Sequence, residues 1–361
     1  MSRTQINASL INPINNTYIG LGRNRLINGD MLFDQRNEGN IVTPPSGTPK
    51  YVADRWGCFN NNTGVFTVQT IGTTPPTGFT KYMHFACTTA DATGGEYRFE
   101  QDIEGYNIRD FNFGTASAVT FTLSFWVRSN QPGLWGGSFY NNASSRMITW
   151  SYTINNANTW EYKTVTVAGD TTGSWVTDTN IGIGVRFALA LGASLQASTG
   201  IWRTTPAYTL GPTGQTNFMS STSNTFDITG LQFEIGSTAT AFEYLPIDIQ
   251  LARCQRYYEK TMASGVAPGS NSQAVLLTAT QINTTTTQGY MTFKVTKRVA
   301  PNIGIYTQGG TLGQLIWVNT SGVTTQRAAN VLNTVQYGFY LRNTAALEYS
   351  AELNFTADAD F

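Results

Sequence analysis

The sequence predicts an all-β protein, and three observations support this prediction. Thr makes up about 15% of the 361 residues, and its β-branched side chain suits pleated strands. Asn, at about 8%, and 35 Gly supply turns between such strands. Charged residues amount to only 12%, so stretches rich in helix-favouring Glu and Lys are rare. We therefore expect a jelly-roll β-sandwich, then a short connector helix, then a smaller C-terminal β-sandwich.

The chain divides into four predicted parts. Residues 1–22 show little hydrophobic periodicity and are rich in Asn, which indicates an extended attachment arm. Residues 23–247 contain strand-like runs separated by Gly, Pro and Asn clusters, which predicts the jelly roll. The connector helix is expected at 248–262 and the second sandwich at 263–361. The clearest predicted strands of the jelly roll are 97–103, 119–128, 147–154, 160–167, 182–191 and 225–235.

Two of these strands predict further detail. In 121–128 the odd-numbered residues are all apolar and share one face, which is the predicted core face. The even-numbered face is half-polar and carries Trp126 and Arg128. In 225–235 the apolar positions change parity at Gly230, which predicts a β-bulge at that glycine.

The helix is predicted from a cap and from apolar spacing. The run 246–248, Pro-Ile-Asp, offers a cap, and Leu251, Cys254, Tyr258 and Met262 then recur every three or four residues over about four turns. The second sandwich is expected to have open strand edges, which would invite trimerisation or docking. Its predicted strands lie near 274–280, 289–295, 302–306, 314–319, 337–341 and 348–356.

Composition and charge exclude several functional classes. Because 22 basic and 22 acidic residues give zero net charge without a basic block, we expect no nucleic-acid partner. The apolar runs are far shorter than the roughly 20 residues that span a bilayer, and the N-terminal twenty residues lack the apolar core of a secretory signal. We therefore expect a soluble protein without membrane insertion. The scattered Cys58, Cys87 and Cys254 predict neither a disulfide framework nor a zinc site, and we expect them to be buried.

Catalytic chemistry has little support, so we expect no enzyme. The chain has one histidine, His84, and Cys87 lies three residues on, on the opposite face of a strand. A pair of carboxylates would suffice for a glycosidase, and an acidic cluster is present. The acidic cluster consists of Glu96, Glu100, Asp102 and Glu104. A solvated outer strand face, or one bridged to Arg98, explains this cluster without catalysis.

Aromatic residues carry the remaining functional signal. Sugars stack on flat aromatic faces while amide, hydroxyl and guanidinium groups bond their hydroxyls, and the chain has 8 Trp and 17 Tyr. The stretch 135–142 mixes aromatics and amides in a predicted loop. Packing in the sandwich core is the alternative role for each of these rings. The glycan-binding candidates are Trp126, Arg128, Trp135, Tyr140, Trp150 and Trp160.

Several segments resemble the virion-associated fibre proteins of tailed bacteriophages. Residues 20–31, 33–36 and 51–56 look like the start of their module, and 122–128 is also part of the match. Residues 228–243 and 251–259 look like the end of the module. The resemblance covers about residues 20–260, and the segment 289–301 is similar to a distal β domain of such fibres. It implies a jelly roll of the galactose-binding-like, carbohydrate-binding kind. It also implies a structural calcium ion near Asp30, although a plain turn explains Asn-Gly-Asp at 28–30 and is the reading we favour.

The resemblance implies a virion structural protein made in the host cytoplasm, most simply a tail fibre subunit. Its expected partners are further copies of itself in a homotrimer, phage tail or capsid proteins through residues 1–22, and host-surface polysaccharide. A capsid or tail decoration protein without receptor binding is the alternative. A polysaccharide depolymerase is a third reading, disfavoured because no evenly spaced β-helix repeat is present.

Overall fold

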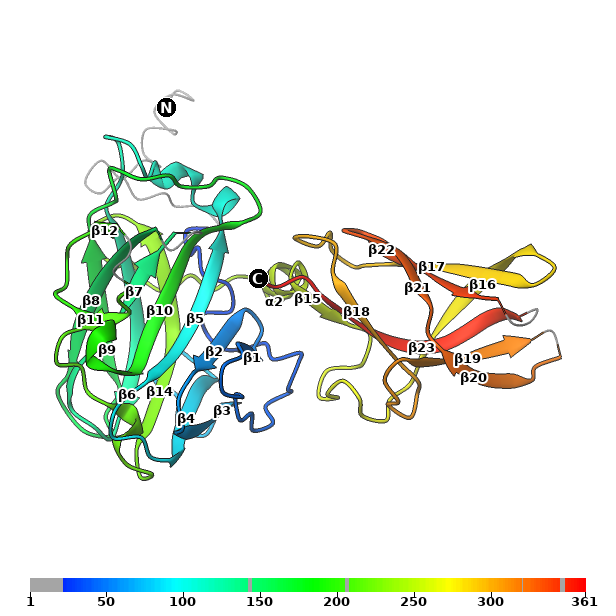
Figure 1. Cartoon of the computed structure of the whole chain (residues 1–361), viewed down its shortest axis with the longest axis horizontal. Coiled ribbons are helices and arrows are strands. Elements are labelled where there is room, and N and C mark those ends of the chain that lie inside the picture. The colour runs from blue at the N-terminus through cyan, green and yellow to red at the C-terminus, as the bar shows by residue number, and fades with distance from the viewer. Residues whose placement is uncertain (1–21, 142–144, 205–207, 320, 345–347) are drawn as a thin grey trace, which may run out of the picture. The chain divides into compact units, whose positions relative to one another are not determined.

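The computed structural model describes residues 22–141, 145–204, 208–319, 321–344 and 348–361 (Figure 1). The predicted arm therefore lies outside the described residues except for Gly22. The described chain folds into two compact units. The first unit comprises 22–32, 41–52 and 56–245, and the second comprises 33–40, 53–55 and 246–361.

The first unit is a β-sandwich, and within the described residues its two main sheets have seven and five strands (Figure 1). The seven-stranded sheet has the order β1 (Lys50–Ala53), β2 (Trp56–Asn60), β5 (Glu96–Glu104), β10 (Ile181–Leu191), β7 (Gly133–Tyr140), β8 (Arg146–Ile154) and β12 (Arg203–Thr204). The five-stranded sheet has the order β3 (Val65–Ile71), β4 (Tyr82–Thr89), β14 (Thr225–Ile235), β6 (Phe121–Ser129) and β9 (Glu161–Val167). Two short strands, β11 (Gln196–Ala197) and β13 (Gly211–Pro212), pair in parallel. The 3₁₀ turns are η1 (Gly105–Asn107), η2 (Arg109–Phe111), η3 (Ala193–Leu195) and η4 (Phe218–Ser220).

The core of the first unit is a layer of aromatic rings between the two sheets. Phe125 of β6 meets Phe187 of β10 at 5.1 Å between ring centroids, and Phe85 of β4 meets Phe99 of β5 at 5.3 Å. Strand alternation places these rings inward, and all four are at most 1% exposed. Such edge-to-face pairs add about 0.5–1.5 kcal/mol each to the gain from burial.

The predictions for β6 and β14 are confirmed. The four odd-numbered residues from Phe121 to Val127 are completely buried. Gly230 has φ +66°, and the pairing register of β14 with β6 shifts between Thr229 and Gln232, as expected of a bulge. The all-β jelly-roll prediction is likewise confirmed.

The second unit is a curled sheet that encloses its own core. In the described chain this sheet has nine strands. Strand β23 joins several of them, because it pairs with β15, β16, β18 and β19 at different points along its length. Trp317 and Phe355 lie in the core with 1% exposure each. The strands are β15 (Tyr258–Lys260), β16 (Val275–Asn283), β17 (Thr286–Thr292), β18 (Asn302–Tyr306), β19 (Gln314–Asn319), β20 (Thr324–Ala328), β21 (Val331–Val335), β22 (Gly338–Asn343) and β23 (Glu348–Asp358).

The predicted helix at 248–262 is too long. The helix α2 covers Ile247–Gln255, and Tyr258–Lys260 instead form strand β15, which pairs with the last residues of β23. The apolar residue Tyr258 fits helical spacing, but it pairs with Asp358, a hundred residues away. The local spacing of apolar residues cannot reveal such a distant strand partner. In the described ranges no helix is long and apolar enough to cross a membrane.

Two short N-terminal segments complete the second unit through buried ion pairs. Arg36 contacts Asp360 at 2.6 Å and Asp358 at 2.9 Å, and Arg55 pairs with the other oxygen of Asp360. The side chains of Arg55 and Asp360 are 1% and 2% exposed. Burial raises the pKa of Asp54 to about 7, although Arg36 favours its ionised form.

Candidate ligand-binding face

The candidate site lies on the outer face of the five-stranded sheet. Thr229 of β14 stands opposite Trp126 of β6, which stands opposite Tyr162 of β9. Side chains at even positions of β6 point away from the core, so Trp126 and Tyr162 lie on the outer surface. Their ring centroids are 5.4 Å apart with planes inclined by 50°. This pair makes a partly exposed aromatic floor.

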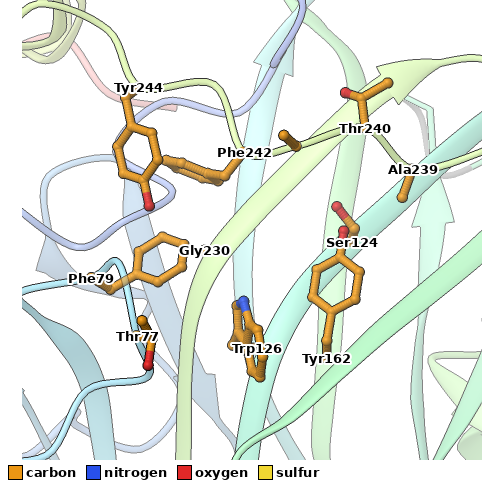
Figure 2. Close-up of a pocket in the computed structure, with 11 residues that line it drawn as sticks. Thr77, Phe79, Ser124, Trp126, Tyr162, Gly230, Ala239, Thr240, Phe242 and Tyr244 are labelled. Atoms are coloured by element: carbon orange, nitrogen blue, oxygen red, sulfur yellow. The ribbon is translucent and has the colours of Figure 1, made fainter.

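A pocket of about 660 Å³ opens over this floor (Figure 2). In Figure 2 Phe79, Phe242 and Tyr244 lie on one side of β14, and Trp126 and Tyr162 lie on the other. Phe79 contacts Phe242 at 5.1 Å and Tyr244 at 5.9 Å between centroids, so these three rings form one wall. Small and hydroxyl side chains complete the lining: Thr77, Ser124, Gly230, Ala239, Thr240 and Ala241.

Hydrogen bonds hold the segment that carries this wall. The Glu243 carboxylate accepts from the backbone N–H of Gly22, Arg23 and Asn24 at 2.8–3.2 Å. The Tyr244 hydroxyl donates to the Gly78 carbonyl at 2.9 Å. These bonds fix the wall before any ligand arrives, which reduces the entropy that binding would cost.

The bulge at Gly230 lets the wall approach the floor. A Cβ atom built at Gly230 would lie 2.6 Å from Phe79 Cζ and 3.1 Å from Trp126 Cδ1. A side chain at this position would therefore enter the space where the two aromatic groups come closest.

A polar cluster adjoins the pocket along β6. Arg128, two residues from Trp126, lies 4.7 Å over the Trp160 ring and donates from Nε to Asp227 at 2.8 Å. The other Asp227 oxygen is 2.6 Å from His84 Nδ1. The lone histidine therefore has a carboxylate partner, and Cys87 lies buried on the opposite side of β4.

Three of the six predicted glycan-binding residues come together on this outer face. They are Trp126 and Arg128 of strand β6, and Trp160, which directly precedes β9. Four aromatic residues of the pocket were missed. The register of β9 with β6 could have placed Tyr162 beside Trp126. Phe79, Phe242 and Tyr244 lie in connecting segments, and the packing of such segments cannot be predicted from local sequence.

The other three candidates are corrected, because the structure buries them. Trp135 belongs to β7 rather than to the predicted loop, is completely buried and packs 5.1 Å from Phe226. Trp150 is 2% exposed in the aromatic core. Tyr140 is 3% exposed, donates its hydroxyl to Asp102 and lies 3.5 Å beneath the Arg186 guanidinium. None of these rings can serve as an exposed stacking platform in this fold.

The acidic cluster of β5 is engaged in ion pairs. Glu100 accepts from Arg186 at 2.7 Å and from Arg98 at 2.9 Å. Burial disfavours the Glu100 carboxylate, but the two arginines outweigh burial and hold its pKa below the usual value. The expected bridge to Arg98 is confirmed, whereas a solvated face is wrong because Glu96 and Glu104 are only 5% and 1% exposed.

Residues 28–31 form a turn in which the Met31 N–H donates to the Asn28 carbonyl at 3.2 Å. Within the described ranges no three His, Cys, Asp or Glu side chains are placed to hold a metal ion. The residues around Asp30 thus show no carboxylate cluster that fits calcium, and a calcium ion there remains a prediction. All three cysteines, each in the described part of the chain, are buried as expected.

Comparisons with known proteins give only distant likenesses. No protein family matches the sequence, and no curated protein matches it. The enzymatically active domain of tailspike protein 4 from bacteriophage CBA120 is similar over 59% of this chain and 21% of its own length, at 15% identity and a TM-score of 0.32. A putative sugar-binding protein from Bacteroides thetaiotaomicron matches over 59% and 99%, at 11% identity and a TM-score of 0.32. The chain spans about a fifth of the tailspike domain, and neither likeness is close enough to assign a function.

Proposed function

We propose that this protein is a non-enzymatic carbohydrate-binding protein and that glycans bind at the pocket over Trp126. The observation that carries the proposal is the pairing of a partly exposed aromatic floor, Trp126 and Tyr162, with an aromatic wall that hydrogen bonds hold in place. The C–H faces of a sugar ring stack on such surfaces, and the exposed Thr77 at the pocket rim offers a hydroxyl group to sugar hydroxyls.

The site is open and contains few polar groups, so a single copy would bind weakly. Several copies on one particle or surface would raise the apparent affinity by avidity without any new contact. This matches a protein that adheres to a repetitive polysaccharide.

Two substitutions in the floor test the proposal. Trp126→Ala and Tyr162→Ala should each weaken binding to a glycan array at least tenfold, about 1.4 kcal/mol, because each removes a stacking face. Tyr106→Ala is the matched control, because Tyr106 is 50% exposed in η1, outside the pocket, and Tyr162 is 43% exposed. Equal binding by all three variants, each shown to be folded by circular dichroism, would refute the site.

We further propose that the protein is a virion appendage of a tailed bacteriophage, most simply a tail fibre subunit. The resemblance of residues 20–260 to fibre modules supports this assignment. Removal of residues 1–22 should abolish incorporation into the particle and leave a folded protein. Normally assembled virions with that truncation would contradict the proposal.

A homotrimer is proposed for the same reason, and the strand order adds a physical motive. In the described sheet of the second unit, β20 and β21 end the main strand order, and β15 and β18 each pair with β23 on one side. The sheet therefore has several unpaired edges, which favour association. Light scattering on the purified chain measures the mass directly. A monomer would contradict the trimer and leave glycan binding untouched.

The decoration protein and the depolymerase are separate outcomes of these experiments. Absence of glycan binding by a multimerised sample would favour decoration. Release of oligosaccharides that Glu100→Gln or Asp102→Asn eliminates would favour a depolymerase, against our proposal. Glu100 is held by two ion pairs and Asp102 accepts from the Tyr140 hydroxyl, and these structural contacts motivate the non-enzymatic proposal.

A further inference from the structure

We infer that the pocket over Trp126 selects uncharged saccharides and excludes acidic ones, an inference that rests on the proposed glycan-binding function. None of the eleven described residues that line the pocket carries a carboxylate, ammonium, guanidinium or imidazole group. Its walls are aromatic rings, small aliphatic groups and hydroxyls. A neutral sugar finds stacking surfaces and hydroxyl partners there, whereas a sugar carboxylate finds no cation.

The nearest cation on the same strand is already compensated. Arg128 donates from Nε to Asp227 at 2.8 Å and from Nη1 to Thr74 at 3.0 Å, and its guanidinium lies over Trp160. Asp227 adds a negative charge to that cluster and also contacts His84. An acidic ligand that recruited Arg128 would have to displace an internal carboxylate that is 5% exposed. This competition makes Arg128 a poor anchor for an external anion.

Arg23, which donates to the carbonyl of the pocket residue Ala241 at 2.7 Å, is likewise compensated by a carboxylate and offers no free cation to an acidic ligand. Glu234, 1% exposed, accepts from the backbone and hydroxyl of Thr240 and pairs with Arg23 at 3.2 Å. Burial and nearby Asp30 raise the pKa of Tyr244, so its phenol stays neutral. An unpaired carboxylate moved from water into such surroundings loses hydration without compensation. Neutral sugars lose no comparable hydration.

An array of neutral and acidic glycans tests the inference on the full chain, biotinylated and multimerised on streptavidin. Neutral glycans should bind at least tenfold more tightly than matched chains carrying uronic or sialic acid, and Trp126→Ala should remove the binding. Thr77→Lys places a cation at an exposed position of the pocket rim. It should reduce the difference in affinity between neutral and acidic glycans at low salt, and high salt should abolish this effect. Thr177→Lys, an exposed threonine of the same unit that does not line the pocket, is the matched control.

The outcomes separate the two proposals. Acidic glycans bound as tightly as neutral ones, with loss of both in Trp126→Ala, would overturn the charge selectivity and leave the glycan site intact. Binding that Trp126→Ala does not change, or no binding at all, would overturn the proposed function and this inference with it. Equal gains of acidic binding in Thr77→Lys and Thr177→Lys would show general surface attraction and would also overturn the selectivity.

Discussion

A methyl group at Gly230 should damage both the stability of the first unit and its ligand-binding pocket. Gly230 adopts φ +66°, a left-handed conformation that costs an L-residue about 1–2 kcal/mol. The added Cβ would also stand 2.6 Å from Phe79 Cζ and 3.1 Å from Trp126 Cδ1. Overpacking of this kind costs about 1–3 kcal/mol, because the rings must leave their preferred positions.

The two contributions can be separated with a second glycine. Gly214 has φ +80° in the same unit, and a Cβ built there has no atom within 4 Å. Gly214→Ala should therefore cost only the conformational 1–2 kcal/mol, whereas Gly230→Ala should cost about 2–5 kcal/mol. Urea-induced unfolding of both variants measures the difference in unfolding free energy.

Glycan binding provides the second readout. Gly230→Ala should weaken binding at least tenfold even at temperatures where the variant is fully folded, because Phe79 and Trp126 move apart. Gly214→Ala should bind like the unmodified chain. An equal loss of stability in both variants, together with unchanged binding by Gly230→Ala, would refute the close approach of wall and floor at the bulge.

Three further predictions concern the buried charges. The pKa of Asp54 is about 7 in the folded protein and 3.8 ordinarily, so the folded state binds this proton more tightly than the unfolded state does. The free energy of unfolding should therefore fall as the pH rises from 3.8 through about 7. Asp54→Asn should remove this pH dependence from the unfolding free energy measured by calorimetry. Asp360→Asn leaves Arg55 buried without its carboxylate and should cost the second unit about 3–5 kcal/mol, measured by urea unfolding, with a loss below 1 kcal/mol counting against the ion pair. Glu100→Gln leaves the buried Arg186 without its carboxylate partner and should destabilise the first unit by a similar amount. Glycan binding by the folded variant should be unchanged on the array. A loss of binding would place Glu100 in the site.

Much of the fold could be predicted because its signals are local. Alternation along β6 marked both faces correctly, and the parity change at Gly230 marked the bulge. The predicted strands of the second unit lie within a few residues of β16, β17, β18, β19, β22 and β23. The errors arise where a distant partner decides. Tyr258 fits a helical pattern but pairs with Asp358, and Trp135 sits in a Gly-rich stretch that becomes a strand only between β8 and β10.

The candidate site was predicted only in part for the same reason. Strand parity could assign Trp126 to an outer face. Trp135 and Trp150 were equally plausible candidates from residue type alone, but the opposite sheet buries them. Which aromatic residues are buried depends on which sheet faces cover each other, and that is a property of the assembled sandwich.

The sequence by itself determined the strand-rich fold class, the core face of each clear strand, the bulge and the absence of net charge. These properties follow from residue type and spacing along a few neighbouring positions. The tertiary structure alone decided which rings remain exposed, how the segments 77–79 and 239–244 close a pocket over Trp126, and which charges neutralise one another. Such contacts join residues up to hundreds of positions apart, so no local pattern of the chain encodes them.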